Sequence, residues 1–129
     1  MISIKRYTRE DEAALFALMK NEGADWEVYW GAESCARYQA ALESCLVYVA
    51  YEDDFLCGYC RCRDDNGFGI YVYDLLVDKH RRGKQIGRRL MAEVSLAFPQ
   101  DTVYVLSGVD GYYEKQGFRR EGSIFAVRL

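Results

Sequence analysis

The segment HRRGKQIGRRLM, residues 80–91, places five Lys or Arg side chains, one histidine and two glycines within one short stretch. It follows an apolar, β-branched run and leads into apolar residues at helical spacing. Backbone N–H groups at the start of a helix carry positive partial charge, and the cationic side chains add directional donors. Gly83 and Gly87 leave room for another backbone or a phosphate to approach. The segment therefore predicts a site for a polyanion, and a diphosphate suits it best.

Two other interpretations of this segment are possible in principle. A Walker phosphate loop does not fit, because Lys84 precedes Gln85 instead of Ser or Thr and the first glycine of that motif is missing. A solvated basic face that caps a helix is the simpler alternative, since runs of charge on helices are usually of that kind.

Composition restricts the class of protein. The chain has 129 residues, half of them apolar, which predicts one packed domain over residues 1–129. The formal net charge of -3 argues against a general affinity for nucleic acid or for an anionic membrane. No apolar run approaches the length of a membrane span, and the first residues lack the pattern of a secretory signal. We therefore expect a cytoplasmic protein.

The chain has five cysteines, and this odd number does not favour a set of disulfides. A reducing cytosol would keep them as thiols. The spacing of Cys57, Cys60 and Cys62 in CGYCRC resembles part of a zinc site. A second cysteine pair at zinc-finger spacing is missing, and His80 is the only imidazole. We expect no metal and interpret these cysteines as small apolar residues of a strand.

The first third of the chain predicts one strand and two helices. ISIKRY alternates apolar and polar residues, and Thr8 then caps a helix that ends at Gly23. A second helical pattern runs from about residue 33 to residue 42. The connection between the helices, ADWEVYWGAES, combines tryptophan, tyrosine and acidic residues.

The rest of the chain predicts three antiparallel strands followed by a crossover. LVYVAY, FLCGYCRCR and GFGIYVYDLLV are separated by the turn signals EDD and DDNG. A helix over 87–98 is expected to bury Leu90, Val94, Ala97 and Phe98. The strand TVYVLSGV, a short helix over 111–115 and a last strand, IFAVRL, complete the order. This order predicts an α+β fold in which the strands flanking the crossover helix are parallel.

Two motifs in this chain resemble those of the GNAT superfamily of acyl-CoA-dependent N-acyltransferases. LLVDKHRRGKQIGRRLM is similar to its acyl-CoA-binding motif, with Arg82 and Gly87 in the first and last positions of the pattern. Gln85 stands where the family has its middle glycine, and we expect it to adopt helical backbone angles that turn its side chain away from phosphate. GYYEKQGFRR is similar to a C-terminal family segment.

The resemblance implies a three-layer α+β (α/β) fold. Its sheet would be mixed and mostly antiparallel, with about six to seven strands, a central parallel pair and about four flanking helices. It also implies acetyl-CoA as co-substrate. The residues that would bind it are Leu76, Val77, Arg81, Arg82, Gly83, Lys84, Gln85, Ile86, Gly87 and Arg88.

The implied reaction is direct attack of a primary amine, on a small molecule or a peptide, on the thioester. A backbone N–H at Leu76 or Val77 would stabilise the oxyanion. Tyr113 would donate a proton to the departing thiolate, since a phenol with a pKa of about 10 is neutral at pH 7. Asp74 and Glu27 are the two candidates for the base that deprotonates the amine, and the sequence does not choose between them.

Two further possibilities stay open. The chain could be a non-catalytic CoA-binding sensor or interaction module of the same fold, because Gln85 departs from the family pattern. The resemblance also makes a homodimer possible. The resemblance also implies that the connection ADWEVYWGAES holds the acceptor site. There, Asp25, Glu27 and the neighbouring tryptophans would favour a cationic acceptor, unless Trp26 and Trp30 only cover the core.

Overall fold

Five strands form one mixed sheet in the computed structural model, which describes residues 1–129. The strands are β1 (Ile2–Arg6), β2 (Leu46–Glu52), β3 (Phe55–Asp64), β4 (Ile70–Val77) and β5 (Val103–Val105). The helices are α1 (Glu12–Glu22), α2 (Glu27–Trp30), α3 (Cys35–Ser44), α4 (Ile86–Ala97) and α5 (Asp110–Lys115). One-turn 3-10 helices lie at Arg9–Asp11, Ala24–Trp26 and Lys79–Arg81.

The strands follow one another in chain order across the sheet, and neighbours from β1 to β4 are antiparallel. Asp53 and Asn66, in the two predicted turns, take positive φ angles of 53° and 52°. Asp and Asn tolerate this conformation better than most residues, which explains why EDD and DDNG reverse the chain. After the crossover through α4, β5 pairs in parallel with β4, as the element order predicted.

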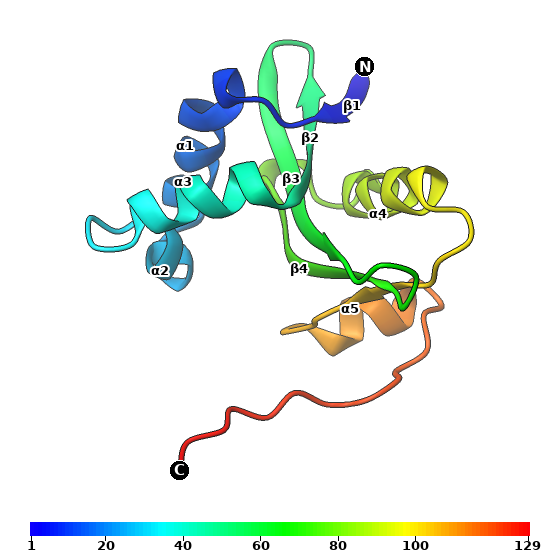
Figure 1. Ribbon diagram of the computed structural model, residues 1–129. Coiled ribbons are helices and arrows are strands. Elements are labelled where there is room, and N and C mark those ends of the chain that lie inside the picture. Colours follow the sequence, from blue (N-terminus) through cyan, green and yellow to red (C-terminus); the bar gives the residue numbers. More distant parts are fainter.

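Helices cover both faces of the sheet, so the three-layer α+β architecture is confirmed (Figure 1). α1 and α3 pack on one face, where Leu15, Met19 and Leu42 are almost fully buried. α4 packs on the other face through Leu90 and Val94. Cys57, Cys60 and Cys62 are buried in the core on the α4 side, consistent with their interpretation as small apolar strand residues.

The sheet has five strands, fewer than the six to seven expected, and its parallel pair lies at one edge of the sheet instead of its centre. Both differences have one cause. IFAVRL, expected as the last strand, forms no strand, and the backbone beyond Phe118 makes no backbone hydrogen bond. An alternating pattern gives strand propensity, but a strand forms only against a partner.

The helices differ from the prediction in three places. Glu27–Trp30, expected as a connection, forms the one-turn helix α2, which makes five α-helices instead of about four. The next helix is α3, shifted two residues toward the C-terminus from 33–42. Ala97, expected to be buried, is exposed in the last turn of α4, while Phe98 packs against the core. None of the helices combines the length and the apolar character of a membrane span.

Candidate functional site

The turn after β4 is fixed by a buried carboxylate. The side chain of Asp78 is 2% exposed and accepts hydrogen bonds from the backbone N–H of His80 (3.1 Å) and from Nη1 of Arg81 (3.0 Å). The backbone N–H of Asp78 donates to the carbonyl of Cys57 at 2.7 Å. These contacts anchor the start of the loop to β3 and fix its backbone conformation.

The start of α4 presents a row of free backbone donors. The first backbone hydrogen bond of the helix joins the N–H of Arg89 to the carbonyl of Gln85 at 2.9 Å, and the N–H groups of residues 82–88 have no acceptor in the protein. Such donors at a helix N-terminus bind anions, because the partial charges of the peptide groups add along the helix axis. The geometry thus fits the polyanion site expected for this segment.

Positive φ angles shape this loop. Gly83 has φ 89°, and no atom lies within 4 Å of the point where its Cβ would stand, so the backbone angle is what requires glycine there. Gln85 has φ 64° and ψ 22°, in the left-handed region. The expectation that Gln85 adopts ordinary helical angles is therefore wrong. Its conformation is one that glycine adopts without strain, and a non-glycine residue there costs about 1–2 kcal/mol.

Gly87 is required for space rather than for its backbone angle. A Cβ on Gly87 would stand 2.7 Å from the hydroxyl oxygen of Tyr112 in α5. Arg88 adds a second link, because its Nη1 donates to both the carbonyl and the side-chain oxygen of Gln116, each at 3.0 Å. The two sequence motifs, far apart in the chain, thus pack against each other at the first turn of α4.

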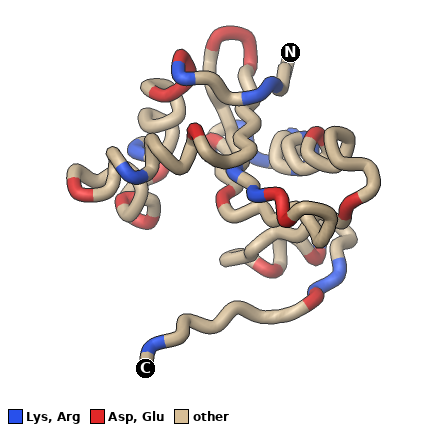
Figure 2. Tube along the Cα trace, in the orientation of Figure 1, with Lys and Arg blue, Asp and Glu red and all other residues tan.

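The cationic side chains of the loop already have partners. Arg81 Nε lies 2.7 Å from Glu52 Oε1, and Lys84 Nζ lies 3.5 Å from Glu52 Oε2. Arg82 donates to the carbonyl of Val77 (3.1 Å) and to Glu22 (2.8 Å). Residues of both charges are spread along the chain (Figure 2). The free backbone donors, more than free side-chain charge, distinguish this site.

β4 and β5 separate beside the loop. Their pairing ends at Val72 and Val105, followed by one bond from the N–H of Leu106 to the carbonyl of Val72 at 2.9 Å. β4 continues to Val77, so the stretch 73–77 pairs with β3 on one edge and has no strand on the other. Leu76 and Val77, the predicted sources of an oxyanion donor, lie on this stretch.

Tyr113 lies in α5, next to this gap. It is partly buried, and its ring packs edge-on against that of Tyr112 with centroids 5.0 Å apart. Burial, with smaller contributions from Tyr112 and Cys60, raises the pKa of Tyr113 to about 12. Its phenol is therefore neutral at physiological pH and able to donate a proton.

The two carboxylates proposed as bases occupy different settings. Asp74 is buried, and its Oδ2 lies 2.6 Å from both Arg61 Nε and the Tyr38 hydroxyl, which lies 2.8 Å from the Tyr59 hydroxyl. Glu27 is exposed at the first residue of α2, and its side chain makes no hydrogen bond. The structure therefore brings neither carboxylate into contact with the loop or with Tyr113.

Arg61 and Tyr38 are the members of this site that the sequence reasoning missed. Arg61 stands opposite Asp74 in the register of β3 and β4, and its guanidinium lies over the ring of Tyr38 at 5.3 Å. Burial raises the pKa of Tyr38 strongly, and the nearby Asp74 carboxylate raises it further. Arg61, which stands between two cysteines of the apolar strand segment CGYCRC, was the one signal that could have found this cluster.

The aromatic residues of the connection between α1 and α3 pack against the core. Trp26 and Tyr29 pack against each other with ring centroids 5.6 Å apart, and Tyr29 packs on Tyr38 at 4.6 Å. The indole N–H of Trp30 donates to the carbonyl of Gly23 at 3.3 Å. A shallow hollow beside them is lined by Val28, Tyr29, Ser34, Arg37, Tyr38 and Ala41.

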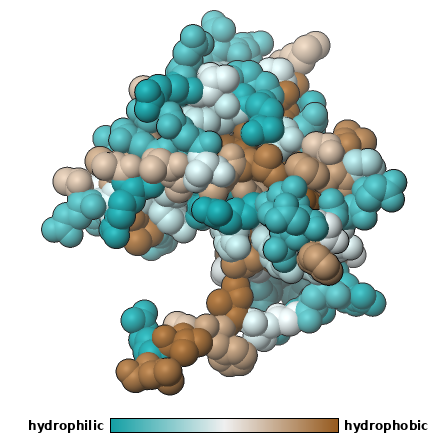
Figure 3. All heavy atoms as spheres, in the orientation of Figure 1, coloured by the Kyte–Doolittle hydropathy of each residue, from teal (hydrophilic) through white to brown (hydrophobic).

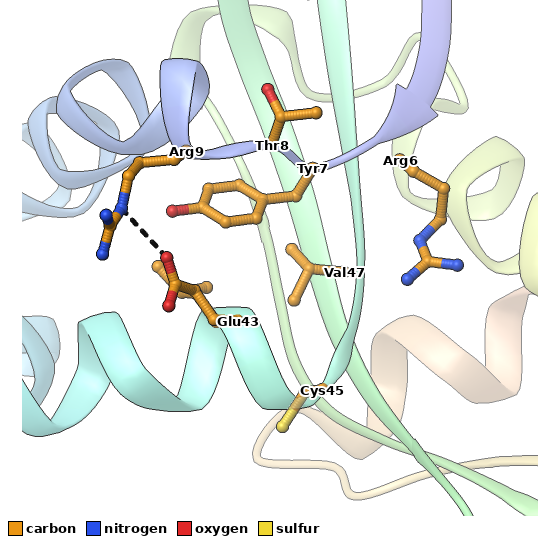
Figure 4. A pocket seen from close by; sticks show the side chains of 8 residues that line it. Arg6, Tyr7, Thr8, Arg9, Glu43, Cys45 and Val47 are labelled. Atoms are coloured by element: carbon orange, nitrogen blue, oxygen red, sulfur yellow. Dashed lines mark ion pairs between the residues drawn. The ribbon is translucent and has the colours of Figure 1, made fainter.

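A second hollow lies between the β1–α1 connection and the end of α3 (Figure 4). Arg9 and Glu43 form an ion pair of 2.9 Å across it. The hydroxyl of Tyr7 is buried there without a hydrogen-bond partner, and burial, followed by the charges of nearby carboxylates, raises the pKa of Tyr7 to about 12. None of the predicted site residues lines this hollow.

Comparisons with known proteins identify the family. The family model of the acetyltransferase (GNAT) domain matches residues 43–120, more than half of the chain. No curated protein matches the chain.

Several solved structures share the fold. A GNAT family acetyltransferase, protein SP0256 of Streptococcus pneumoniae TIGR4, is 26% identical over 100% of both chains, with a TM-score of 0.71. An aminoglycoside acetyltransferase, HMB0005, from an uncultured soil metagenomic sample is 23% identical over 100% of this chain and 99% of its own, with a TM-score of 0.75. The PaiA N-acetyltransferase of Thermoplasma acidophilum, solved in complex with coenzyme A, is 18% identical over 94% of this chain and 91% of its own, with a TM-score of 0.67. Because the family model matches residues 43–120, which include both the loop before α4 and α5, the chain belongs to the GNAT acetyltransferase family.

Proposed function

We propose that this protein transfers the acetyl group of acetyl-CoA to a primary amine of a small molecule or peptide. The observation that carries the proposal is the row of free backbone N–H groups over residues 82–88, beside the unpaired stretch of β4. The coenzyme A complex of the structural neighbour from Thermoplasma supports the choice of ligand. When bound, acetyl-CoA supplies an acyl group activated as a thioester.

The backbone donors of Gly83, Lys84, Gln85, Ile86 and Gly87 would hold the pyrophosphate, since they point out of the helix end and need an acceptor. Arg81 is held by Asp78 and Glu52, so it shapes the loop. Arg82, Lys84 and Arg88 are largely exposed and would exchange their present partners for phosphate oxygens. Leu76 or Val77 would supply the backbone donor for the oxyanion.

Tyr113 is assigned as the proton donor to the departing thiolate. Its pKa of about 12 keeps the phenol protonated at every pH at which the enzyme would work. The same raised pKa makes it a weaker acid than an ordinary tyrosine. We therefore place its contribution near the lower end of the usual range for general acid catalysis, about 100-fold in rate.

We propose Glu27 or Asp74 as the base, and the surroundings of the two carboxylates favour different roles. Glu27 is exposed and free to accept a proton from an incoming amine. Asp74 already holds Arg61 and Tyr38, so it would act only through water or through a neighbouring tyrosine. A cationic acceptor is consistent with the exposed acidic side chains of Asp25 and Glu27 at this end of the molecule.

A non-catalytic CoA-binding module is the alternative, and one observation favours it. Gln85 holds the left-handed conformation at the position where the family pattern has glycine, within the row of free backbone donors. If this side chain blocks acyl transfer but not binding, acetyl-CoA would bind without turnover.

The experiment is an amine screen with acetyl-CoA, using the Tyr113→Phe and Tyr112→Phe variants as a matched pair. Turnover of any amine by the unmodified protein, lowered about 100-fold by Tyr113→Phe with unchanged acetyl-CoA affinity, supports catalysis. Tyr112→Phe controls for the loss of a neighbouring hydroxyl and should change the rate little. Acetyl-CoA binding without turnover of any amine would favour the sensor.

The remaining expectations are also proposals. We treat residues 1–129 as one catalytic domain that acts in the cytoplasm. No role with nucleic acid or membranes is proposed. The homodimer that the resemblance made possible stays a proposal that rests on the resemblance.

A further inference from the structure

Two contacts join the loop before α4 to the end of α1, which is distant from it in the chain. Nη2 of Arg82 lies 2.8 Å from Oε1 of Glu22, the last residue of α1. One residue earlier, the carbonyl of Asn21 accepts a hydrogen bond from Nζ of Lys79 at 3.4 Å. The loop proposed to hold the pyrophosphate is therefore attached to the C-terminal end of α1.

Glu22 is a carboxylate at a position where a helix favours a cation. The last carbonyls of a helix carry negative partial charge, which repels an acidic side chain and attracts a basic one. The side chain of Glu22 is 22% exposed, and Arg82 is the one residue to which it is hydrogen-bonded. Arg82 thus supplies the positive charge that makes this position of Glu22 favourable.

Gly23, the next residue, holds both tryptophans of the chain. Its carbonyl accepts one hydrogen bond from the backbone N–H of Trp26 at 3.1 Å and another from the indole N–H of Trp30 at 3.3 Å. The N–H of Gly23 in turn donates to the carbonyl of Met19 in α1 at 3.2 Å. The last turn of α1 therefore fixes the peptide group to which the two tryptophans are bonded.

The connection after Gly23, residues 24–34, is held from one side only. Trp26, Tyr29 and Trp30 pack against the core, while Ala24 and Val28 are exposed. α2 and the loop after it lie at an outer end of the molecule (Figure 1). No other part of the chain covers that end on the face that Figure 3 shows. A change at Gly23 can therefore move the connection without displacing another element.

We propose that Glu22 is a positioning residue that couples the CoA site to the connection 24–34. The inference rests on the proposed function, in which Arg82 exchanges its present partners for phosphate oxygens. When Arg82 binds phosphate, Glu22 loses its counter-charge at the end of α1, and the last turn readjusts together with the Gly23 carbonyl. Trp26 and Trp30 then change their environment. Such coupling is reciprocal, so an acceptor that favours the changed connection also strengthens CoA binding.

The expected coupling is modest because the ion pair is not deeply buried. The side chains of Arg82 and Glu22 are 51% and 22% exposed. Ion pairs of this kind change an equilibrium constant by a factor of about two to five. Arg82 has to leave Glu22 before it reaches phosphate, so Glu22 opposes CoA binding by that factor.

Tryptophan emission tests the proposal, because Trp26 and Trp30 are the only tryptophans of the chain. The full-length unmodified protein, Glu22→Gln, Arg82→Ala and Glu10→Gln are titrated with coenzyme A. Calorimetry gives the affinity, and emission is excited at wavelengths where adenine does not absorb. Glu10→Gln is the matched control, because it removes the same charge from an exposed side chain just before α1.

The proposal predicts that coenzyme A changes the emission of the unmodified protein and of Glu10→Gln. Glu22→Gln should bind coenzyme A about two- to fivefold more tightly, with little change in emission. Arg82→Ala leaves Glu22 charged and unpaired, so without ligand it should show the emission of the CoA-bound unmodified protein.

Three results would each overturn the coupling and leave the CoA site intact: coenzyme A binding without a change in emission, a change that persists in Glu22→Gln, or weaker binding by Glu22→Gln. An Arg82→Ala emission equal to that of the ligand-free unmodified protein would also overturn it. If none of the four proteins binds coenzyme A, the proposed function fails together with the coupling.

Discussion

Replacing Asp74 by Asn tests whether this buried carboxylate is a structural element. The side chains of Asp74 and Arg61 are 3% and 15% exposed, and Nε lies 2.6 Å from Oδ2. The substitution keeps the shape but leaves the guanidinium buried opposite a neutral amide. Removing one member of a buried ion pair costs about 3–5 kcal/mol, and we expect the lower end, because the amide oxygen can still accept the hydrogen bond from Tyr38.

The double variant Arg61→Met/Asp74→Leu distinguishes the cost of removing the whole ion pair from the cost of leaving one charge unpaired. Removing both charges leaves no unpaired ion, so its cost should be about 0–2 kcal/mol, well below the sum of the single variants. Urea unfolding is the assay. With a slope of about 1.5–2 kcal/mol/M, a loss of 3 kcal/mol lowers the midpoint of Asp74→Asn by about 1.5–2 M.

Either of two results would refute this reasoning: a loss below about 1 kcal/mol for Asp74→Asn, or single-variant losses that add up to that of the double variant. Activity gives a separate answer about catalysis. A structural carboxylate leaves the pH profile of kcat/KM of the folded variant unchanged, whereas a catalytic base removes its acidic limb. Glu27→Gln is the comparison, because that side chain is exposed and carries no ion pair.

Three other substitutions test particular contacts. Gly87→Ala places a methyl group 2.7 Å from the Tyr112 hydroxyl, so the Tyr112 side chain must move away. The free energy of unfolding, measured by chemical unfolding, should change by no more than about 1 kcal/mol. Calorimetry should show weaker acetyl-CoA binding. Burial raises the pKa of Asp11, but hydrogen bonds from Lys5, Tyr51 and Thr8 outweigh it and lower the pKa overall; its contribution to stability is therefore present above pH ~4 and lost as the pH falls through the lowered pKa. The Tm curves of the unmodified protein and Asp11→Asn, measured from pH 2 to pH 7, should converge in acid, and parallel curves would contradict the assignment. Tyr7→Phe removes an unpaired buried hydroxyl and should raise stability by on the order of 1 kcal/mol in urea unfolding, unlike Tyr51→Phe, whose hydroxyl donates to Asp11 at 2.6 Å.

Much of the fold could be predicted because its signals are local. Turn residues at Asp53 and Asn66 and the apolar spacing of Leu90 and Val94 act through neighbouring positions in the chain. The absence of the last strand could not be predicted. IFAVRL has the residue pattern of a strand, but whether it finds a strand to pair with depends on the rest of the molecule.

For the candidate site too, the local features could be predicted from the sequence and the others could not. The cationic loop and the helix that begins at Ile86 could be predicted from residue types and spacing. The left-handed angles of Gln85 could not, since a side chain at that position suggests an ordinary helical conformation. Nor could the pairing of Asp74 with Arg61, which depends on the register between two strands.

Isothermal titration calorimetry with acetyl-CoA tests the central claim most directly: that the free backbone donors of residues 82–88 hold the pyrophosphate. The unmodified protein is compared with Gln85→Gly, which relieves the left-handed strain, and with Lys79→Ala, which removes a cation outside the donor row. We predict micromolar binding by all three, equal or tighter for Gln85→Gly. Binding by Gln85→Gly alone would mean that Gln85 has disabled the loop, and no binding by any of them would contradict the assignment of the site.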